Sequence, residues 1–461
     1  MKTKTLLTTF ITALLLSACG GGGGNQQATA STTETATVET IEIAPIIPAI
    51  IDIAGNLENR KEFRLSDFGS SVQYIRLQPP AGIELRSIRN TFISSEELII
   101  VNDWYGLFVF SANGEYLRTL VSNKWEDAGI PAPGGGVGFR QTDGILNNVD
   151  FLNGTLFYRT RQWASMDAGI TDVQLNIIDI ESLPENAPPT FQRELPFNII
   201  GTENLSENIQ PTFQRELDPG RDGRGTWMLI DDNSFLAIVN NAVGVPALTA
   251  RLIHCGDTLF TINNYRQPNI TGGIMTSSTS TFYRFDGNVM MQIAHNDTVF
   301  ALIPPNRLEP AFIMNWGEFK PDMNRLANGA TEEDKFVLQR WVETQRHIFI
   351  EYTEGRIFPA RWEENNIPRH LAVFDKETKT LSHHTAPTLP VIPIPLMFEN
   401  DIDPVGMPFF PQGVNHRGEM FMVFGKLQVQ QQIATGKFDN SRLQALYNRM
   451  EEGSFYLMVV R

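Results

Sequence analysis

Residues 97–120 read ELIIVNDWYGLFVFSANGEYLRTL, and this segment contains the clearest strand and turn pattern of the chain. Two apolar runs, Ile99–Val101 and Leu107–Phe110, precede an Asn113-Gly114 pair, and a third run follows it. Asn-Gly between apolar runs is the strongest short-range hairpin signal, because both turn positions need a positive φ. The stretch therefore predicts antiparallel strands that follow one another directly along the chain.

Similar hairpin patterns recur further along, at residues 282–290, 297–316 and 371–383. Meandering antiparallel strands at this density imply a sandwich, a barrel or a propeller. No linker interrupts the chain after Thr40, and sandwiches of this length are normally split into several domains. Length therefore favours a β-propeller, although the repeats have diverged too far to give the number of blades.

Two segments depart from the strand pattern and predict small helical insertions. In residues 331–345, Val337, Leu338 and Trp341 recur at helical spacing after a Thr-Glu-Glu-Asp start. In residues 440–452, Leu443, Leu446, Tyr447 and Met450 lie on one helical face. We interpret both as decorations packed on the strands, and the alternative is that they bind a partner.

The amino terminus predicts export and lipidation. Lys2 and Lys4 precede an apolar run, and Leu16-Ser17-Ala18-Cys19 has the small residues of a lipoprotein cleavage site. The run is too short for an ordinary membrane span. Residues 1–18 are therefore the predicted signal peptide, with Cys19 as the lipidated residue; the alternative is an ordinary secretory signal with an incidental cysteine.

Composition divides the rest of the chain and limits its partners. A Gly-rich and then Ser/Thr-rich stretch makes residues 19–55 the predicted tether, and residues 56–461 the folded domain. A net charge of −15 argues against binding nucleic acid.

Once Cys19 is lipidated, Cys255 is the one thiol left, so no intramolecular disulfide holds the fold. We interpret Cys255 as a buried strand residue.

Several stretches resemble the six-bladed β-propeller lipoproteins of the Bacteroidetes. The resemblance lies in residues 63–68 and 72–77, the hairpins described above, and Asn400-Asp401-Ile402-Asp403 leading to residues 406–411. At the last motif this chain has Pro404-Val405-Gly406 where the family has two glycines. The resemblance implies an all-β, six-bladed β-propeller closed by a terminal strand, with residues 455–460 pairing with residues 72–77.

Asp401 and Asp403 are the candidate metal ligands. They alternate along one predicted strand face beside Asn400, and carboxylate oxygens suit Ca²⁺. The favoured interpretation, however, is that these side chains cap backbone groups of a turn, as Asp and Asn commonly do. No catalytic residue is identified.

Thr258 and Thr298 are candidate glycosylation sites. Each lies in a short Asp-Thr-aliphatic pattern of the kind used for O-glycosylation in Bacteroidetes. Patterns of three residues also arise by chance, so the two sites are hypotheses.

The function predicted is that of an outer-membrane lipoprotein that acts as a binding or scaffold module for an unknown protein or glycan, anchored by its lipid and facing the periplasm or the cell surface. The alternative is a propeller hydrolase or lyase of the lactonase type with a metal in its channel. A third hypothesis is a signalling lipoprotein that senses an extracytoplasmic ligand.

Overall fold

The computed structural model describes residues 47–461 with gaps, of which the longest are 180–192, 195–225, 264–280, 356–367 and 386–396. For the strands between residues 124 and 263 it describes the backbone and only a few side chains. Residues 46–461 form one compact unit. The predicted signal peptide, Cys19 and Cys255 lie outside the described residues.

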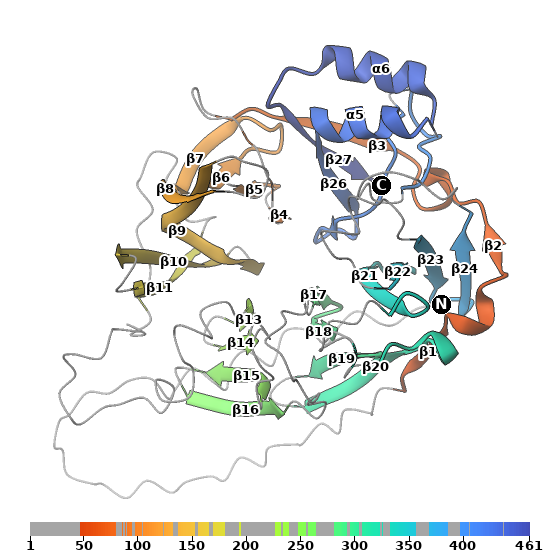
Figure 1. The fold of residues 1–461 in the computed structure, drawn as a ribbon, viewed down its shortest axis with the longest axis horizontal. Helices are drawn as coiled ribbons and strands as arrows, with labels where there is room; N and C mark the ends of the chain where they lie inside the picture. The colour runs from red at the N-terminus through yellow and green to blue at the C-terminus, as the bar shows by residue number, and fades with distance from the viewer. Residues whose placement is uncertain are drawn as a thin grey trace, which may run out of the picture. The chain divides into compact units, whose positions relative to one another are not determined.

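The strands form six sheets, named I to VI in chain order, that follow one another around a ring (Figure 1). Sheet I contains β4 (Asn90–Ile93), β5 (Ile99–Asp103), β6 (Gly106–Phe110) and β7 (Tyr116–Ser122). Sheet II contains β8 (Lys124–Pro131), β9 (Val137–Leu152), β10 (Thr155–Ser165), β11 (Gly169–Asp179) and β12 (Arg193–Glu194). Sheet III contains β13 (Thr226–Asp231), β14 (Ser234–Ile238), β15 (Leu248–His254) and β16 (Asp257–Asn263).

The other three sheets each include a strand from the start of the chain. Sheet IV contains β17 (Thr281–Phe285), β18 (Asn288–Gln292), β19 (Thr298–Ile303), β20 (Arg307–Asn315) and β1 (Ala49–Asp52). Sheet V contains β21 (Phe336–Glu343), β22 (His347–Glu354), β23 (Arg369–Asp375), β24 (Thr380–His384) and β2 (Arg60–Lys61). Sheet VI contains β25 (Gly413–Val414), β26 (Met420–Gly425), β27 (Phe455–Val460) and β3 (Val72–Leu77).

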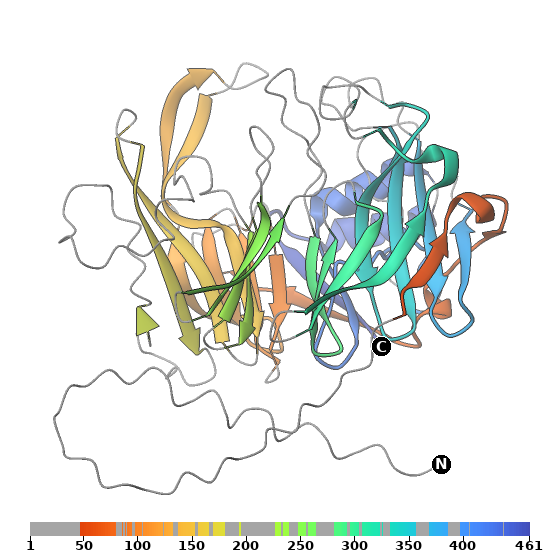
Figure 2. The ribbon, with the colours of Figure 1, turned by 90° about the horizontal axis from the view of Figure 1, so that it is seen from below.

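Residues 49–77 form an N-terminal belt along the outer edges of sheets IV, V and VI. Its strands β1 and β2 pair in parallel with β20 and β24, and β3 pairs antiparallel with β27. The short 3₁₀ helices η1 (Ala54–Asn56) and η2 (Leu65–Asp67) connect them. Figure 2 shows β1 and β2 at the edges that they extend. The belt covers strand edges that would otherwise be open to pairing with another chain.

The predicted closing strand is confirmed. β27 pairs with β3 over the full six residues, from Phe455 opposite Leu77 to Val460 opposite Val72. The predicted hairpins of residues 97–120, 282–290 and 371–383 are confirmed as well. At Gly114 the φ is 81° and an added Cβ would lie 2.1 Å from the carbonyl oxygen of Arg76, so the turn requires glycine.

The structure is an all-β propeller, but the predicted count of six blades is corrected. A propeller blade is a four-stranded sheet, and only sheets I, III and VI have four strands. Sheets IV and V gain a fifth strand from the belt, and sheet II has five strands, including a β9 of 16 residues. The sheets are therefore unequal, and six equivalent blades are not supported.

The helix predicted for residues 331–345 is wrong, because this segment contains β21. Its apolar residues point to both faces of a buried strand, and Gln339 is an extra residue that shifts the register between Leu338 and Arg340. Before this β-bulge Phe336 faces the seam with sheet IV; after it Trp341 faces that seam. A one-residue insertion reverses the alternation, and the result imitates helical spacing.

The second predicted helix is confirmed as α6 (Asn440–Arg449), which buries Leu443 and Leu446. It is paired with α5 (Lys426–Thr435), which the sequence did not predict. The two helices lie beside sheet VI (Figure 1), and Val429 of α5 belongs to the same apolar core as Leu443. No helix among the described residues is long and apolar enough to cross a lipid bilayer.

The apolar core lies in the seams between neighbouring sheets. The largest cluster joins sheets V and VI to the helices and to Phe63 and Leu65 of the belt. Another joins sheets IV and V and includes Ile51 of the belt. Residues 49–55, which the sequence assigned to the tether, thus form β1 and the first two residues of η1 and contribute to the core.

Replacing Leu457 by alanine should lower the free energy of unfolding by about 2–5 kcal/mol, because a fully buried leucine on the closing strand leaves a cavity. Leu427→Ala is the matched control: Leu427 is 60% exposed, and its replacement should change stability by less than about 0.5 kcal/mol. Urea unfolding measures both. Equal losses in the two variants would contradict the assigned core.

Candidate functional site

Asp401, a predicted metal ligand, binds the N-terminal belt. Its Oδ1 accepts the backbone N–H of Ser66 at 3.0 Å, and its Oδ2 accepts the Ser66 hydroxyl at 2.6 Å. Both carboxylate oxygens therefore hold η2 against the loop that precedes sheet VI.

Asp403 binds the same belt two residues later. Its Oδ2 accepts the hydroxyl of Tyr74 at 3.0 Å, and its Oδ1 accepts the backbone N–H of Gly406 at 3.3 Å. The amide of Asn400 also donates to Tyr74 and to Asp403. Burial and the Asp403 carboxylate raise the pKa of Tyr74 above its ordinary value, so this hydroxyl stays protonated and donates.

Among the described residues, no three His, Cys, Asp or Glu side chains gather as metal ligands. Asp403 accepts a backbone N–H three residues later, whereas Asp401 binds Ser66 of the belt. A metal at Asp401 and Asp403 stays a prediction. Thr298 begins β19, and its partly buried side chain has a hydroxyl 3.4 Å from Oδ1 of Asp297. For Thr258 only the backbone in β16 is described.

A cationic site, which the sequence did not predict, lies on β21, the strand of sheet V nearest the centre of the ring (Figure 1). The bulge at Gln339 places Arg340 opposite Glu351 of β22. The bulge itself is fixed because the Gln339 amide donates to the Thr353 hydroxyl at 3.0 Å and to the Val337 carbonyl at 3.2 Å. Bulges of this kind re-aim side chains and are common beside functional sites.

Two arginines share the carboxylate of Glu351, which is fully buried. Nε of Arg340 lies 2.5 Å from Oε2, and Nη2 of Arg369 donates to Oε1. The side chains of Arg340 and Arg369 are 29% and 19% exposed. One carboxylate thus pairs with two cations at a site that solvent reaches.

Arg340 also lies over an aromatic ring. Its guanidinium carbon is 4.4 Å from the ring centroid of Phe410, which is fully buried in the seam between sheets V and VI. Burial lowers the pKa of Arg340, Glu351 opposes this shift, and Arg369 adds to it. The group stays charged at neutral pH, because the arginine guanidinium is not deprotonated in proteins.

Two other acidic groups, Glu343 on β21 and Asp150 on β9, are also engaged. Glu343 accepts hydrogen bonds from the Tyr283 hydroxyl at 2.7 Å and from Lys376 at 2.9 Å. Burial raises the pKa of Glu343, although Lys376 and Tyr283 oppose the shift. Asp150 of sheet II receives two hydrogen bonds from Arg284 of sheet IV, at 2.6 and 2.7 Å. These pairs join sheets and leave both carboxylates with cationic partners.

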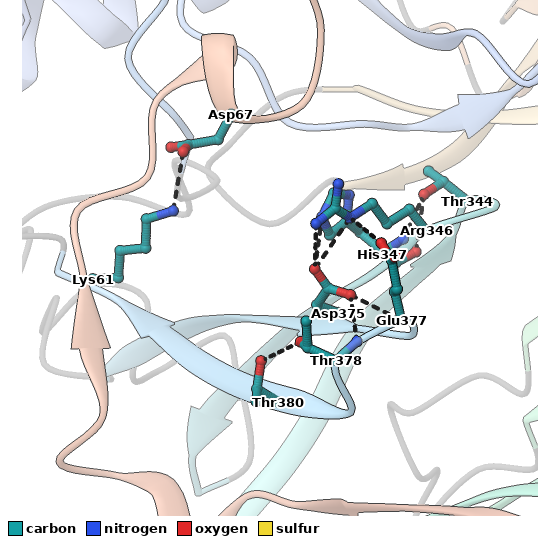
Figure 3. Close-up of polar contacts among 9 residues, drawn as sticks. All are labelled: Lys61, Asp67, Thr344, Arg346, His347, Asp375, Glu377, Thr378 and Thr380. Carbon is teal, nitrogen blue, oxygen red and sulfur yellow. Dashed lines mark hydrogen bonds and ion pairs between the residues drawn. The ribbon is translucent and has the colours of Figure 1, made fainter.

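A third polar cluster lies at the hairpin ends of sheet V (Figure 3). Asp375 accepts the backbone N–H groups of Glu377 and Thr378 and binds Arg346 at 3.0 Å. Thr344 and His347 exchange hydrogen bonds across the preceding turn. A separate pair on the belt joins Lys61 to Asp67 at 3.0 Å. These are contacts that close turns.

The adjacent histidines of β24 have separate roles. His383 is buried, and its Nε2 lies 3.3 Å from the Tyr352 hydroxyl, whereas Nδ1 of His384 accepts the backbone N–H of Phe63 at 3.2 Å. Burial lowers the pKa of His383 to about 4, and the nearby His370 adds to the shift.

One feature of the sequence points to the cationic site. Glu351 is a lone charge inside the apolar run of residues 348–352, and a charge buried in this way needs a partner. Its two partners are 11 and 18 residues away and are brought to it by strand pairing, which spacing alone does not reveal.

We expect Asp403→Asn to lower the free energy of unfolding by about 1–3 kcal/mol, to the same extent in Ca²⁺ and in EDTA, because a charge-assisted bond to Tyr74 is lost. In the double variant Asp403→Asn/Tyr74→Phe, the loss in free energy of unfolding should differ from the sum of the two single losses. The exposed Asp334→Asn is the control. If Asp401 and Asp403 hold a metal, the wild type will instead lose stability in EDTA and the variant will not respond.

Stability should also fall below pH 6.5 because of His383. Its pKa is about 4 in the folded state and about 6.5 in the unfolded state, so the unfolded state binds the proton first as the pH falls. The wild type should lose about 2 kcal/mol more than His383→Gln between pH 7 and pH 5, at 1.36 kcal/mol per unit. The exposed His416→Gln is the control. Parallel stability curves for the wild type and His383→Gln would refute this role.

Comparison with one solved structure supports the fold, and two others are similar to a lower degree. A putative exported protein from Bacteroides fragilis superposes with a TM-score of 0.52 at 13% identity, over 89% of this chain and 99% of that one. A member of the DUF4221 family from Bacteroides vulgatus gives a TM-score of 0.40 at 9% identity, over 85% and 97%. Virginiamycin B lyase from Staphylococcus aureus gives 0.27 at 10% identity, over 85% and 99%.

No curated protein matches the sequence. Residues 43–184 and 252–435, which are more than half of the chain, match a family described as a domain of unknown function, DUF4933. The match spans the belt, the core of sheets IV and V, and the cationic site. The chain therefore belongs to the DUF4933 family.

Proposed function

We propose that this protein is a lipid-anchored, extracytoplasmic propeller that binds a ligand and holds it at the outer membrane. The amino-terminal signal with Cys19 supports the anchor. The likeness of the fold to an exported protein of Bacteroides fragilis is consistent with this location.

The observation that carries the binding role is the state of four charged groups, Asp150, Glu343, Glu351 and Arg340. Asp150, Glu343 and Glu351 are each engaged by a cation, whereas Arg340 shares its carboxylate with a second arginine and is partly exposed. A general base needs a carboxylate or imidazole that can reach the substrate proton. The arrangement offers hydrogen-bond donors for recognition more readily than a base for catalysis.

The anchor can be tested by metabolic labelling. Cells that express the protein and take up an alkyne palmitate analogue should label the wild type in the membrane fraction, because the lipid is attached to Sγ of Cys19. Cys19→Ala should carry no label, and Cys255→Ala, the matched control, should label like the wild type. Label retained in Cys19→Ala would refute lipidation at this residue.

A second experiment tests the binding role. The purified protein is screened with soluble glycans, peptides and small acids for compounds that raise its unfolding temperature, as a ligand of the folded state must. Each such compound is then recovered after long incubation and analysed by mass spectrometry. Unchanged compounds support a binding module, and cleaved or rearranged ones contradict it.

A further inference from the structure

Arg340 and Arg369 share the carboxylate of Glu351. The single negative charge of Glu351 is divided between two guanidinium groups, one on the innermost strand and one at the start of β23. Arg340 therefore does not have this carboxylate to itself. A second anion at Arg340 would interact with it in surroundings where burial strengthens charge interactions.

The hydrogen-bonding capacity of Arg340 also favours the binding of an anion. A guanidinium has five N–H donors in a fixed plane, and Glu351 lies at Nε. Within the part of the chain that the structure describes, the two terminal nitrogens of Arg340 have no hydrogen-bond partner, and the side chain is 29% exposed. The open edge of the guanidinium is the one that binds a carboxylate through two parallel hydrogen bonds.

Arg340 is also held in place before any ligand arrives. The ring of Phe410 lies beneath its guanidinium, Glu351 fixes its Nε, and the bulge at Gln339 sets its direction. Fixing a donor in advance reduces the entropy that binding would otherwise lose. A lysine could not replace it, because an ammonium has no planar pair of donors.

We propose that Arg340, assisted by the charge of Arg369, binds a carboxylate group of the ligand at the inner end of the seam between sheets V and VI. This inference rests on the proposed function, since it names the chemical class of the ligand that the propeller holds.

The first test measures binding of sodium succinate to the full mature protein by calorimetry and by the shift in unfolding temperature, with sodium chloride keeping ionic strength constant. Succinate should bind, and neutral succinamide should not. Sulfate and phosphate are compared at the same concentrations, because they offer the same charge in a tetrahedral shape. Tighter binding of either than of succinate would overturn the assignment to a carboxylate.

Four variants separate the site from general effects of salt. Arg340→Gln should weaken succinate binding about tenfold or more, and Arg340→Lys should also weaken it because the planar pair of donors is lost. Arg346→Gln changes an arginine of the turn cluster and should bind like the wild type. Glu351→Gln should bind succinate more tightly, because the internal competitor loses its charge.

Arg340→Gln is expected to weaken succinate binding and Glu351→Gln to strengthen it, so the test stays decisive if one variant is unstable. The unfolding temperature of each variant is measured without ligand first. Equal binding in the wild type and Arg340→Gln, or weaker binding in a folded Glu351→Gln, would overturn the inference. A different ligand from the screen that binds unchanged and independently of Arg340 would overturn it while leaving the proposed function intact.

Discussion

The pairing of β27 with β3 is the interaction on which the rest of the structure depends. It joins residues 72–77 to residues 455–460, and the backbone of Arg461 continues the contact to Ser71. Without β3, sheet VI would consist of two full strands and the two-residue β25. The chain between β3 and β27 forms a long loop, and closing it has a large entropic cost. The hydrogen bonds between β3 and β27 and the burial of Leu457 and Val459 offset this cost.

Once β3 is fixed, the belt that precedes it is positioned along sheets V and IV. The loop before sheet VI fastens the belt twice, through Asp401 to Ser66 and through Asp403 to Tyr74. The same loop then crosses to the inner end of the seam, where Phe410 lies beneath Arg340. One segment therefore connects the outer edge of the ring to the cationic site, and the acidic motif that suggests a metal has contacts that hold the chain start in place.

The cationic site depends on two local features that coincide, the β-bulge at Gln339 and the buried charge of Glu351. The bulge at Gln339 reverses the alternation of β21, so that Arg340 turns away from the seam with sheet IV and toward Glu351 and Phe410. A buried charge requires a partner, and strand pairing provides two for Glu351. The proposed binding site therefore lies where the strand pattern is broken, which is also where sequence patterns are least reliable.

The sequence by itself determined the local elements: the hairpins at Asn113-Gly114 and Asp286-Gly287, the amphipathic helix α6, and the apolar closing strand. Each depends on residues within a few positions of one another, so spacing and turn chemistry suffice to predict it. Tertiary structure decided the unequal sheets, the belt, the strand identity of residues 336–343 and the meeting of Arg340, Glu351 and Arg369. These depend on strand register between distant segments, and register is set by the packing of both faces at once, which no single stretch of sequence encodes.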